Sequence, residues 1–320
     1  MPSIGIRVIV CALLTLSCAS QHHAGPHISE LSFNDCNISD RRMELLSTLV
    51  RESNDLKKLT LAKCGINMRG MGALAAGIGK SKSLTALEIH SNNIDKEGVR
   101  RICDAMGASK SLVSLSLVDC RQNAFLSMAG LAFGIGLNPT LRELNINLCW
   151  LGAHDAARLA KALESNTNIV RIDISCNNIG DEGVASLSET LSEHNSTITF
   201  LDISSNQFGA SGAASVAKCL LANSVLKHLE LMRNDFGDAG ATHLASAIRL
   251  NSTLEKLNIS ATNIGDTGAV NIGDALIVNN RMRTVWIAEN KVGAMGMQSL
   301  ERAARVSLSL DEICFETNGH

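Results

Sequence analysis

The chain has 320 residues and a formal net charge of −2, with neither a basic run nor an acidic tail. This charge balance gives no electrostatic footprint for nucleic acid, so we expect no nucleic-acid partner. Only three prolines occur, and no linker rich in serine and glycine divides the chain, which favours one elongated domain over two globular ones.

Residues 1–27 differ from the rest of the chain. Arg7 precedes an apolar run that ends at Leu16, and small residues follow at 18–20, which is the layout of a secretory signal peptide. The run is too short for a membrane span, so we expect membrane contact only if this segment is an anchor. The alternative is an apolar N-terminal cap on the domain that follows.

From residue 28 onward the chain repeats one unit, and residues 169–195 are its clearest copy. Ile169, Ile172 and Ile174 stand at relative positions 0, +3 and +5, followed by Asn177 at +8 and Ile179 at +10. This spacing matches the pattern L-x-x-L-x-L-x-x-N/C-x-L of leucine-rich repeats. It predicts a short strand followed by a tight turn.

The second half of the unit has the period of a helix. Gly180 and Asp181 are expected to provide a turn and a helix N-cap, and Val184, Leu187 and Leu191 then fall on one helical face at +15, +18 and +22. A strand with one apolar face and a helix with one apolar stripe cannot bury themselves alone. Only stacked copies can form a core.

The unit recurs along the whole remaining chain, at intervals of 28 residues except for two of 29. Its starts are Ile28, Leu56, Leu84, Leu112, Leu141, Ile169, Ile198, Leu226, Leu254, Met282 and Leu310. We predict an α/β leucine-rich repeat solenoid, a horseshoe with a parallel concave sheet and convex helices. It occupies residues 28–320 in about eleven repeats, of which the last is incomplete.

The period and turn-helix sequences such as NNIGDEGVASLSETL and NDFGDAGATHLASAI resemble the ribonuclease-inhibitor type of leucine-rich repeat. That type also occurs in NOD-like receptors and in Ran GTPase-activating protein. The resemblance covers nearly the whole chain from Ile28 and is specific for fold, because the matching residues form the scaffold. It implies a protein-binding function, and no functional residue of the family is carried over.

Two adjacent repeats depart from the pattern. In the fourth, Gln122 stands at +10 and Phe125 follows, with one extra residue before the helix. In the fifth, Asp155 replaces the glycine usual near the start of the helix, and Trp150 lies in the loop. This departure is either drift on a tolerant loop or a partner-contact bulge.

Four of the ten cysteines, Cys36, Cys64, Cys120 and Cys149, occupy the +8 position where other repeats carry asparagine. Asparagine there can hydrogen-bond the turn backbone of its own and adjacent repeats, and cysteine can replace it as a small buried group with a weak S–H donor. We expect reduced structural thiols, although disulfides between neighbouring repeats are geometrically allowed. Thiols favour a cytoplasmic protein; the alternative is a secreted one, if residues 1–20 are a signal peptide.

Four glycosylation sequons begin at Asn37, Asn195, Asn251 and Asn258. Those at Asn195 and Asn251 are the repeat's own N-x-T-L connection, so they arise without selection for glycans. The sequons become informative only if the chain enters the secretory pathway.

The side chains at +2, +4 and +6 of each strand are expected to point into the concavity. Asp173, Asp202 and Glu230 occupy +4 of three consecutive repeats, and Phe200, Met232 and Trp286 lie on the same face. Carboxylates beside large apolar side chains are typical of a protein interface, so these six are the predicted partner-binding residues. The alternatives are solvated carboxylates balanced by Arg171, Lys227 and Arg233, and lateral packing of Trp286.

We predict a non-enzymatic scaffold that binds a protein partner with a basic surface on the concave face. The alternative is a regulator of an enzyme, either a GTPase activator or a ribonuclease inhibitor, as the resemblance suggests. No Ser/His/Asp or Cys/His constellation stands apart from the repeat, so we expect no catalytic residue, cofactor, metal or small-molecule substrate. The histidines at 22, 23 and 27 are interpreted as a solvated tail rather than a transition-metal site.

Overall fold

The computed structural model describes residues 19–21, 28–92, 94–119 and 128–315. Most of the N-terminal segment, with its apolar run and its histidines, lies outside the described residues, as do Gln122 and Phe125. The chain divides into two compact units, Met1–Trp150 (unit 1) and Leu151–His320 (unit 2). The prediction of a single domain over residues 28–320 stays a prediction.

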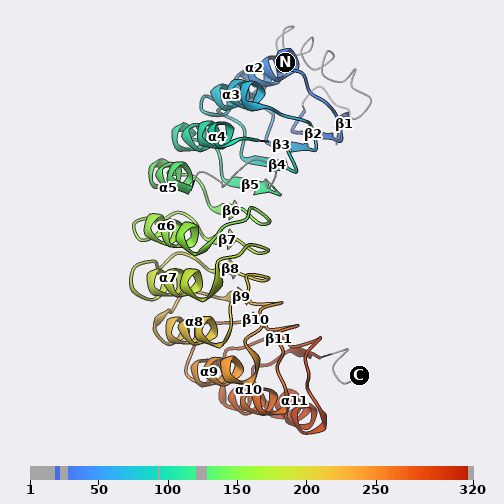
Figure 1. Cartoon of the computed structure of the whole chain (residues 1–320), viewed down its shortest axis with the longest axis vertical. Helices are drawn as coiled ribbons and strands as arrows, with labels where there is room; N and C mark the ends of the chain where they lie inside the picture. Colours follow the sequence, from blue (N-terminus) through green and yellow to red (C-terminus); the bar gives the residue numbers. More distant parts are fainter. Residues whose placement is uncertain (1–18, 22–27, 93, 120–127, 316–320) are drawn as a thin grey trace. The chain divides into compact units, whose positions relative to one another are not determined.

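Unit 1 alternates strands and helices in chain order (Figure 1). Its elements are β1 (Ala19–Gln21), β2 (Glu30–Asn34), α2 (Asp40–Glu52), β3 (Lys58–Ala62), α3 (Met68–Ile78), β4 (Ala86–His90), α4 (Lys96–Ala108), β5 (Ser114–Val118), α5 (Met128–Leu137) and β6 (Glu143–Asn145). Strands β2 to β6 pair in parallel, each with the next, and β1 pairs antiparallel with β2. The N-terminal segment therefore contributes a strand to the edge of this sheet.

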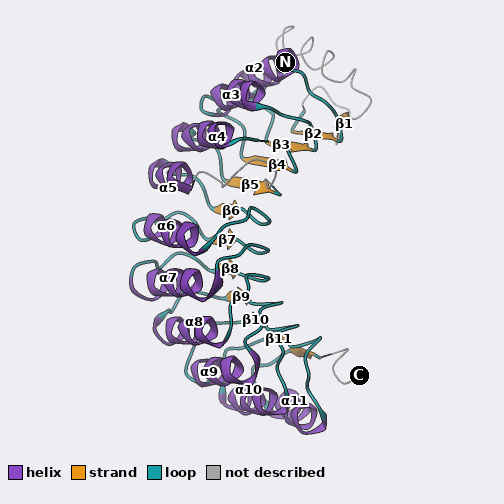
Figure 2. Ribbon diagram, viewed as in Figure 1, coloured by secondary structure: helices purple, strands orange, loops and turns teal. Residues whose placement is uncertain are grey.

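Unit 2 has the same alternation (Figure 2). Its elements are α6 (Ala153–Leu163), β7 (Arg171–Asp173), α7 (Gly180–Glu193), β8 (Phe200–Asp202), α8 (Ala210–Ala222), β9 (His228–Glu230), α9 (Gly237–Ile248), β10 (Lys256–Asn258), α10 (Asp266–Val278), β11 (Thr284–Trp286), α11 (Ala294–Val306) and β12 (Glu312–Cys314). Strands β7 to β12 are parallel, and each pairs with the next so that equivalent positions of neighbouring repeats lie side by side. The predicted strand-turn-helix unit is confirmed.

The core of each unit lies between its sheet and its helices. In the repeat that contains β7, Ile169, Ile172 and Ile174 are buried from the strand side, while Val184 and Leu187 are buried from the helix side. The same positions are buried in most other described repeats, and they are half-buried at Ile28, Met297, Leu310 and Ile313 near the two ends. Since the apolar faces of strand and helix meet within each repeat and against its neighbours, the stacked copies form a continuous core.

Side chains at +8 satisfy the backbone between repeats, as predicted. Asn206 is fully buried, and its Nδ2 donates to the carbonyls of Ile174 in the preceding repeat (3.0 Å) and Ser204 in its own (3.1 Å). In turn its backbone N–H donates to Oδ1 of Asn234, the +8 residue of the next repeat (2.7 Å). Cys64 replaces one of the asparagine bonds, because its Sγ donates to the carbonyl of Phe33 in the preceding repeat (3.3 Å).

A second row of buried asparagines precedes the strands of unit 2, and the sequence reasoning did not identify it. Asn223 lies three residues before Leu226, whose backbone N–H its Oδ1 accepts at 2.8 Å. Its Nδ2 donates to the carbonyl of Leu191 in the preceding repeat at 2.7 Å. Each such side chain therefore joins the helix end of one repeat to the strand start of the next.

The prediction that Asp181 caps its own helix is wrong. In α7 the N-cap position is Ile179, which makes no side-chain cap bond. Asp181 instead accepts from the backbone N–H groups of Gly209 (2.8 Å) and Gly212 (2.7 Å), at the start of the next helix, α8. Asp238 and Asp266 do the same for α10 and α11. Helices α8, α10 and α11 are thus capped across the repeat boundary, where the carboxylate satisfies amides that have no partner within the helix.

The described cysteines include the disulfide-bonded Cys36, several buried thiols and the exposed thiol Cys176. Cys36 is disulfide-bonded, which corrects the expectation of a thiol at that position. Cys64, Cys103 and Cys219 are buried free thiols, as expected for Cys64. Burial raises the pKa of Cys64 and raises those of Cys103 and Cys219 to about 12, so the reactive thiolate is scarce at neutral pH.

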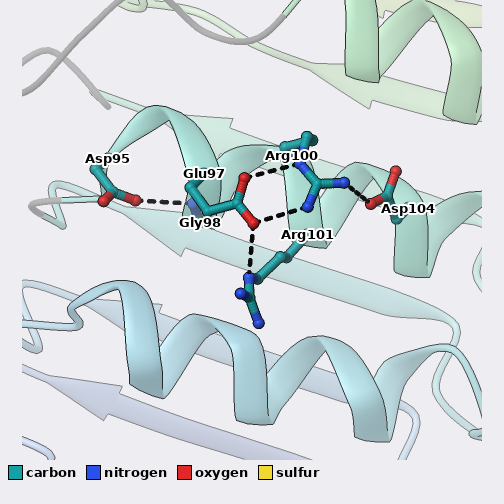
Figure 3. A network of polar contacts seen from close by, with 6 residues as sticks. All are labelled: Asp95, Glu97, Gly98, Arg100, Arg101 and Asp104. Carbon is teal, nitrogen blue, oxygen red and sulfur yellow. Dashed lines mark hydrogen bonds and ion pairs between the residues drawn. The ribbon is translucent and has the colours of Figure 1, made fainter.

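The outer face of α4 carries a network of charged side chains (Figure 3). Glu97 accepts from Arg100 (2.7 and 2.8 Å) and Arg101 (3.0 Å), and Arg100 also donates to Asp104 (2.6 Å). The hydrogen bonds from Arg100, with those from Arg101, lower the pKa of Glu97 to about 2. These groups are exposed, so the network contributes little to stability and chiefly keeps this helix face hydrated.

No helix in the described ranges has the length and apolar character to cross a bilayer.

Two glycines of α5 provide a matched test of the packing between α4 and α5. A Cβ on Gly134 would lie 2.6 Å from the carbonyl oxygen of Cys103, whereas a Cβ on Gly136 meets nothing within 4 Å. We expect Gly134→Ala to lower the free energy of unfolding by about 2 kcal/mol through overpacking. Gly136→Ala should leave it unchanged or raise it by up to about 1 kcal/mol. Urea unfolding followed by circular dichroism measures both, and equal stabilities would contradict this packing.

Candidate partner-binding surface

One face of the unit 2 sheet carries the predicted partner-binding residues. In β7, β8 and β9 the middle residues Ile172, Leu201 and Leu229 are buried in the core. Neighbouring strand residues point to the opposite face, so the residues on either side of them face away from the helices. We call this group the acidic-aromatic surface; it consists of Arg171, Asp173, Phe200, Asp202, His228, Glu230, Met232 and Trp286, all of them half-buried except the exposed Arg171.

Three carboxylates run across the surface in adjacent strands. Asp173 pairs in register with Asp202, and Asp202 with Glu230. The first two are held in place by their own strand ends: Oδ1 of Asp173 accepts from the backbone N–H of Ser175 (3.0 Å), and Oδ1 of Asp202 from that of Ser204 (2.9 Å). Adjacent strands lie about 4.8 Å apart, so like charges are close to one another.

Asp202, at the centre of the three, resists ionisation. Burial raises its pKa to about 6, and the neighbouring Asp173 and Glu230 carboxylates add to the effect. Hydrogen bonds from Ser204 act in the opposite direction and do not outweigh burial. The charge on Asp202 at neutral pH therefore destabilises the folded chain.

Asparagine performs the same structural task at +4 elsewhere. Oδ1 of Asn258 in β10 accepts from the backbone N–H of Ser260 (3.0 Å), and Oδ1 of Asn145 in β6 accepts from that of Asn147 (3.1 Å). A neutral amide thus satisfies the strand end as well as a carboxylate does. The fold does not require the negative charges at Asp173 and Asp202.

A row of planar side chains lies beside the carboxylates, at +2 of the strands and at Trp286. The guanidinium carbon of Arg171 lies 3.3 Å from the centroid of the Phe200 ring, a cation–π geometry. Phe200 meets His228 edge to face at 4.6 Å, and the rings of His228 and Trp286 are stacked with their centroids 6.1 Å apart. Trp286 therefore packs laterally, as one alternative held, and keeps part of its surface exposed.

His228 joins the two rows. Its Nε2 lies 2.6 Å from Oε1 of Glu230. This contact links the planar row to the carboxylates through a hydrogen bond between the two side chains. No arginine or lysine of the described residues lies within 4 Å of the carboxylates of Asp173, Asp202 or Glu230. The alternative in which Arg171, Lys227 and Arg233 balance these charges therefore has no ion pair to support it in the described residues.

All six predicted residues lie on this surface, and the structure adds two. Arg171 and His228 stand at +2, which is expected to face the same way as +4 and +6. The signal was present, since Arg171, Phe200 and His228 follow one another at +2 of three repeats. Met232 contacts Asn258 of the neighbouring strand β10, whose Nδ2 lies 3.9 Å from its Sδ.

The corresponding face of unit 1 differs in charge balance. The Glu88 carboxylate at +4 forms an ion pair with Lys58 Nζ (2.6 Å) and accepts a hydrogen bond from the Thr60 hydroxyl (2.9 Å). Burial opposes its ionisation, but these two hydrogen bonds outweigh burial and lower the pKa of Glu88. His90 there contacts Ser116 (3.3 Å). Glu88 thus has a lysine partner within its own sheet, whereas Asp173 and Asp202 have no cationic partner among the described residues.

The described residues contain no group of three or more histidine, cysteine, aspartate or glutamate side chains that would hold a metal ion. The acidic-aromatic surface therefore offers charge, hydrogen-bond acceptors and aromatic area, which are the means of recognising another molecule by contact.

Comparison with known proteins places the fold in a family. The family described as Leucine Rich repeat matches residues 80–103, 137–160, 165–188, 194–217, 222–245 and 250–273. The chain belongs to the leucine-rich repeat proteins, and repeats of 28 or 29 residues that each contain a helix are consistent with the ribonuclease-inhibitor type. A search of curated protein sequences finds no significant match.

One solved structure supports the same fold, and two others are similar over part of the chain. The chain is similar to one in the yeast Rad7 and Elc1 complex, at 15% identity and a TM-score of 0.53, covering 91% of this chain and 76% of that one. It is also similar to the tropomodulin C-terminal domain of Caenorhabditis elegans (21% identity, TM-score 0.39, 50% and 92% covered). A third similar structure is actin-binding site 2 of leiomodin-1 (18%, 0.31, 48% and 75%).

Removing the charge of Asp202 should stabilise the protein at neutral pH. The folded pKa of about 6 exceeds the ordinary value of 3.8, so this group's stabilising contribution is present below about pH 4 and is lost as the pH rises through 6. We expect Asp202→Asn to raise the free energy of unfolding by about 2 kcal/mol at pH 7.5 and to have little effect at pH 4.

Urea unfolding at both pH values measures this difference. The control is Asp235→Asn, a change at an exposed loop residue that should not alter the difference between the two pH values. A destabilised Asp202→Asn variant at pH 7.5 would contradict the assignment of an unbalanced charge.

Proposed function

We propose that the acidic-aromatic surface binds a protein partner that presents a basic side chain next to an apolar one, and that the chain is a non-enzymatic scaffold. The observation that carries the proposal is the charge at Asp202. It destabilises the fold, it has no cationic partner among the described residues, and asparagine at the same position of β10 makes the same backbone bond. A charge retained at such a cost is accounted for by a ligand of opposite charge.

The aromatic row supplies the apolar part of the proposed interface. Trp286 and Phe200 are half-buried, so they are held in position by their neighbours while part of each ring faces solvent. Pre-positioned tryptophan and arginine side chains are the residue types that contribute most to protein interfaces. An arginine or lysine of the partner would lie over the carboxylates, with its neighbouring apolar side chain against Trp286.

The proposed partner chemistry is tested with a peptide library displayed on phage. The library is selected on the full chain and counter-selected on the triple variant D173N/D202N/E230Q, in which only the charges change. Lysine or arginine beside an apolar residue should be enriched among the selected peptides. Peptides without basic residues, or equal capture by the triple variant, would contradict the proposal.

For a selected peptide, Trp286→Ala should weaken binding by about 2 kcal/mol, which is roughly a 30-fold rise in Kd. Trp150→Ala is the matched control, because that tryptophan is 68% exposed and lies in unit 1. Its Kd should match that of the unmodified chain in isothermal titration calorimetry. An unchanged Kd for Trp286→Ala would remove this residue from the interface.

The same peptide should bind more weakly as salt is raised from 50 to about 500 mM, because screening weakens attraction between exposed charges. The triple variant should have lost most of this salt dependence along with its affinity. A salt response that is identical in both proteins would assign the attraction to charges elsewhere.

A further inference from the structure

The sequon Asn37-Ile38-Ser39 lies in the loop between β2 and α2 of unit 1. Asn37 and Ser39 are exposed, whereas Ile38 between them is 3% exposed and its backbone N–H donates to the carbonyl of Cys64 at 3.1 Å. The backbone is extended at Ser39, with φ −64° and ψ 156°. The buried middle residue thus anchors the loop and leaves the two side chains that define a sequon at the surface.

Neither of these two side chains has a structural task. Ser39 occupies the N-cap position of α2, yet its hydroxyl makes no cap bond. The amide of Asn37 makes no hydrogen bond to any residue in the described part of the chain. The side chain lies next to Gly65, where the absence of a Cβ leaves space beside it.

The other three sequons are committed to the fold. Asn195 and Asn251 are buried, and their Nδ2 atoms donate to the carbonyls of Leu163 (2.9 Å) and Leu220 (2.7 Å). Asn258 lies within β10, where its Oδ1 holds the backbone N–H of Ser260. A glycan on Asn195 or Asn251 would break a bond between repeats, and Asn258 is half-buried on the sheet face between neighbouring strands. Asn37 is the sequon asparagine that the fold leaves both exposed and uncommitted.

The residue before this sequon supplies an independent observation. Cys36 is disulfide-bonded, and disulfides persist in the oxidising secretory compartments where asparagine-linked glycans are added. The buried thiols Cys103 and Cys219 are compatible with that environment, because burial keeps them protonated and out of reach of oxidants.

We propose that Asn37 is an N-glycosylation site and that the chain passes through the secretory pathway. The Nδ2 atom of Asn37 forms a bond to the anomeric carbon of a polyprenyl-diphosphate-linked oligosaccharide and loses one proton. The bond from that carbon to the diphosphate breaks, and the polyprenyl diphosphate leaves. The Ser39 hydroxyl, which is free of the fold, is the second recognition element of the sequon.

The test is expression of the full chain, with its own N-terminus, in a eukaryotic cell. The purified protein is treated with peptide N-glycosidase F and its peptides are mapped by mass spectrometry. One glycan per chain is expected, and deglycosylation should convert residue 37, and no other sequon asparagine, to aspartate.

Three variants separate recognition from folding. Ser39→Ala should abolish the glycan while Asn37 remains, Ser39→Thr should retain it, and Asn195→Gln should leave it unchanged while lowering stability. A folded chain that carries no glycan at residue 37, or that carries one at 195, 251 or 258, would overturn the proposal. So would a glycan that survives Ser39→Ala.

Discussion

The structure depends on satisfying backbone groups that stacking removes from water. Each repeat closes over its neighbour and buries turn carbonyls and amides, which are costly to leave unpaired. Side chains at +8 meet this need: Asn206 reaches both the preceding and its own repeat, and it passes one bond to Asn234 in the following repeat. The apolar core supplies the driving force for stacking, but this chain of amide bonds sets the register. Where cysteine or threonine replaces asparagine, as at Cys64 and Thr262, the donor is kept.

The same requirement, that each buried backbone group has a hydrogen-bond partner, shows which charges on the acidic-aromatic surface the fold does not need. A sheet face turned away from the core is free to vary, and at +4 the fold requires only an acceptor for one backbone N–H. Asn258 meets that requirement without a charge, whereas Asp202 meets it at a cost. In unit 1, Glu88 is neutralised by Lys58. The uncompensated carboxylate of Asp202 therefore distinguishes the unit 2 surface from the corresponding face of unit 1.

The sequence predicted the fold well because two periods, of strand and helix, are fixed in one register. Interior positions such as Ile172 and Val184 follow from that register alone. Interactions between repeats were harder to predict from the sequence, because they depend on which neighbouring repeat a polar side chain reaches. Asp181 has the sequence position of a cap for its own helix and bonds the next one instead. Strand alternation places the six predicted partner-binding residues on one face, but the stacking of His228 on Trp286 across an intervening strand depends on side-chain reach, which spacing does not specify.

Capping across the repeat boundary gives unit 2 a direction. Asp181, Asp238 and Asp266 each precede, in the order of translation, the helix whose first amides they accept. When α8, α10 or α11 leaves the ribosome, the acceptor for its amides already stands in the repeat behind it. Shortening the chain from its C-terminal side preserves the acceptors of every helix that remains. Shortening it from the other side so that α8, α10 or α11 becomes the first helix removes the acceptor of that helix, so the two ends are not equivalent for assembly.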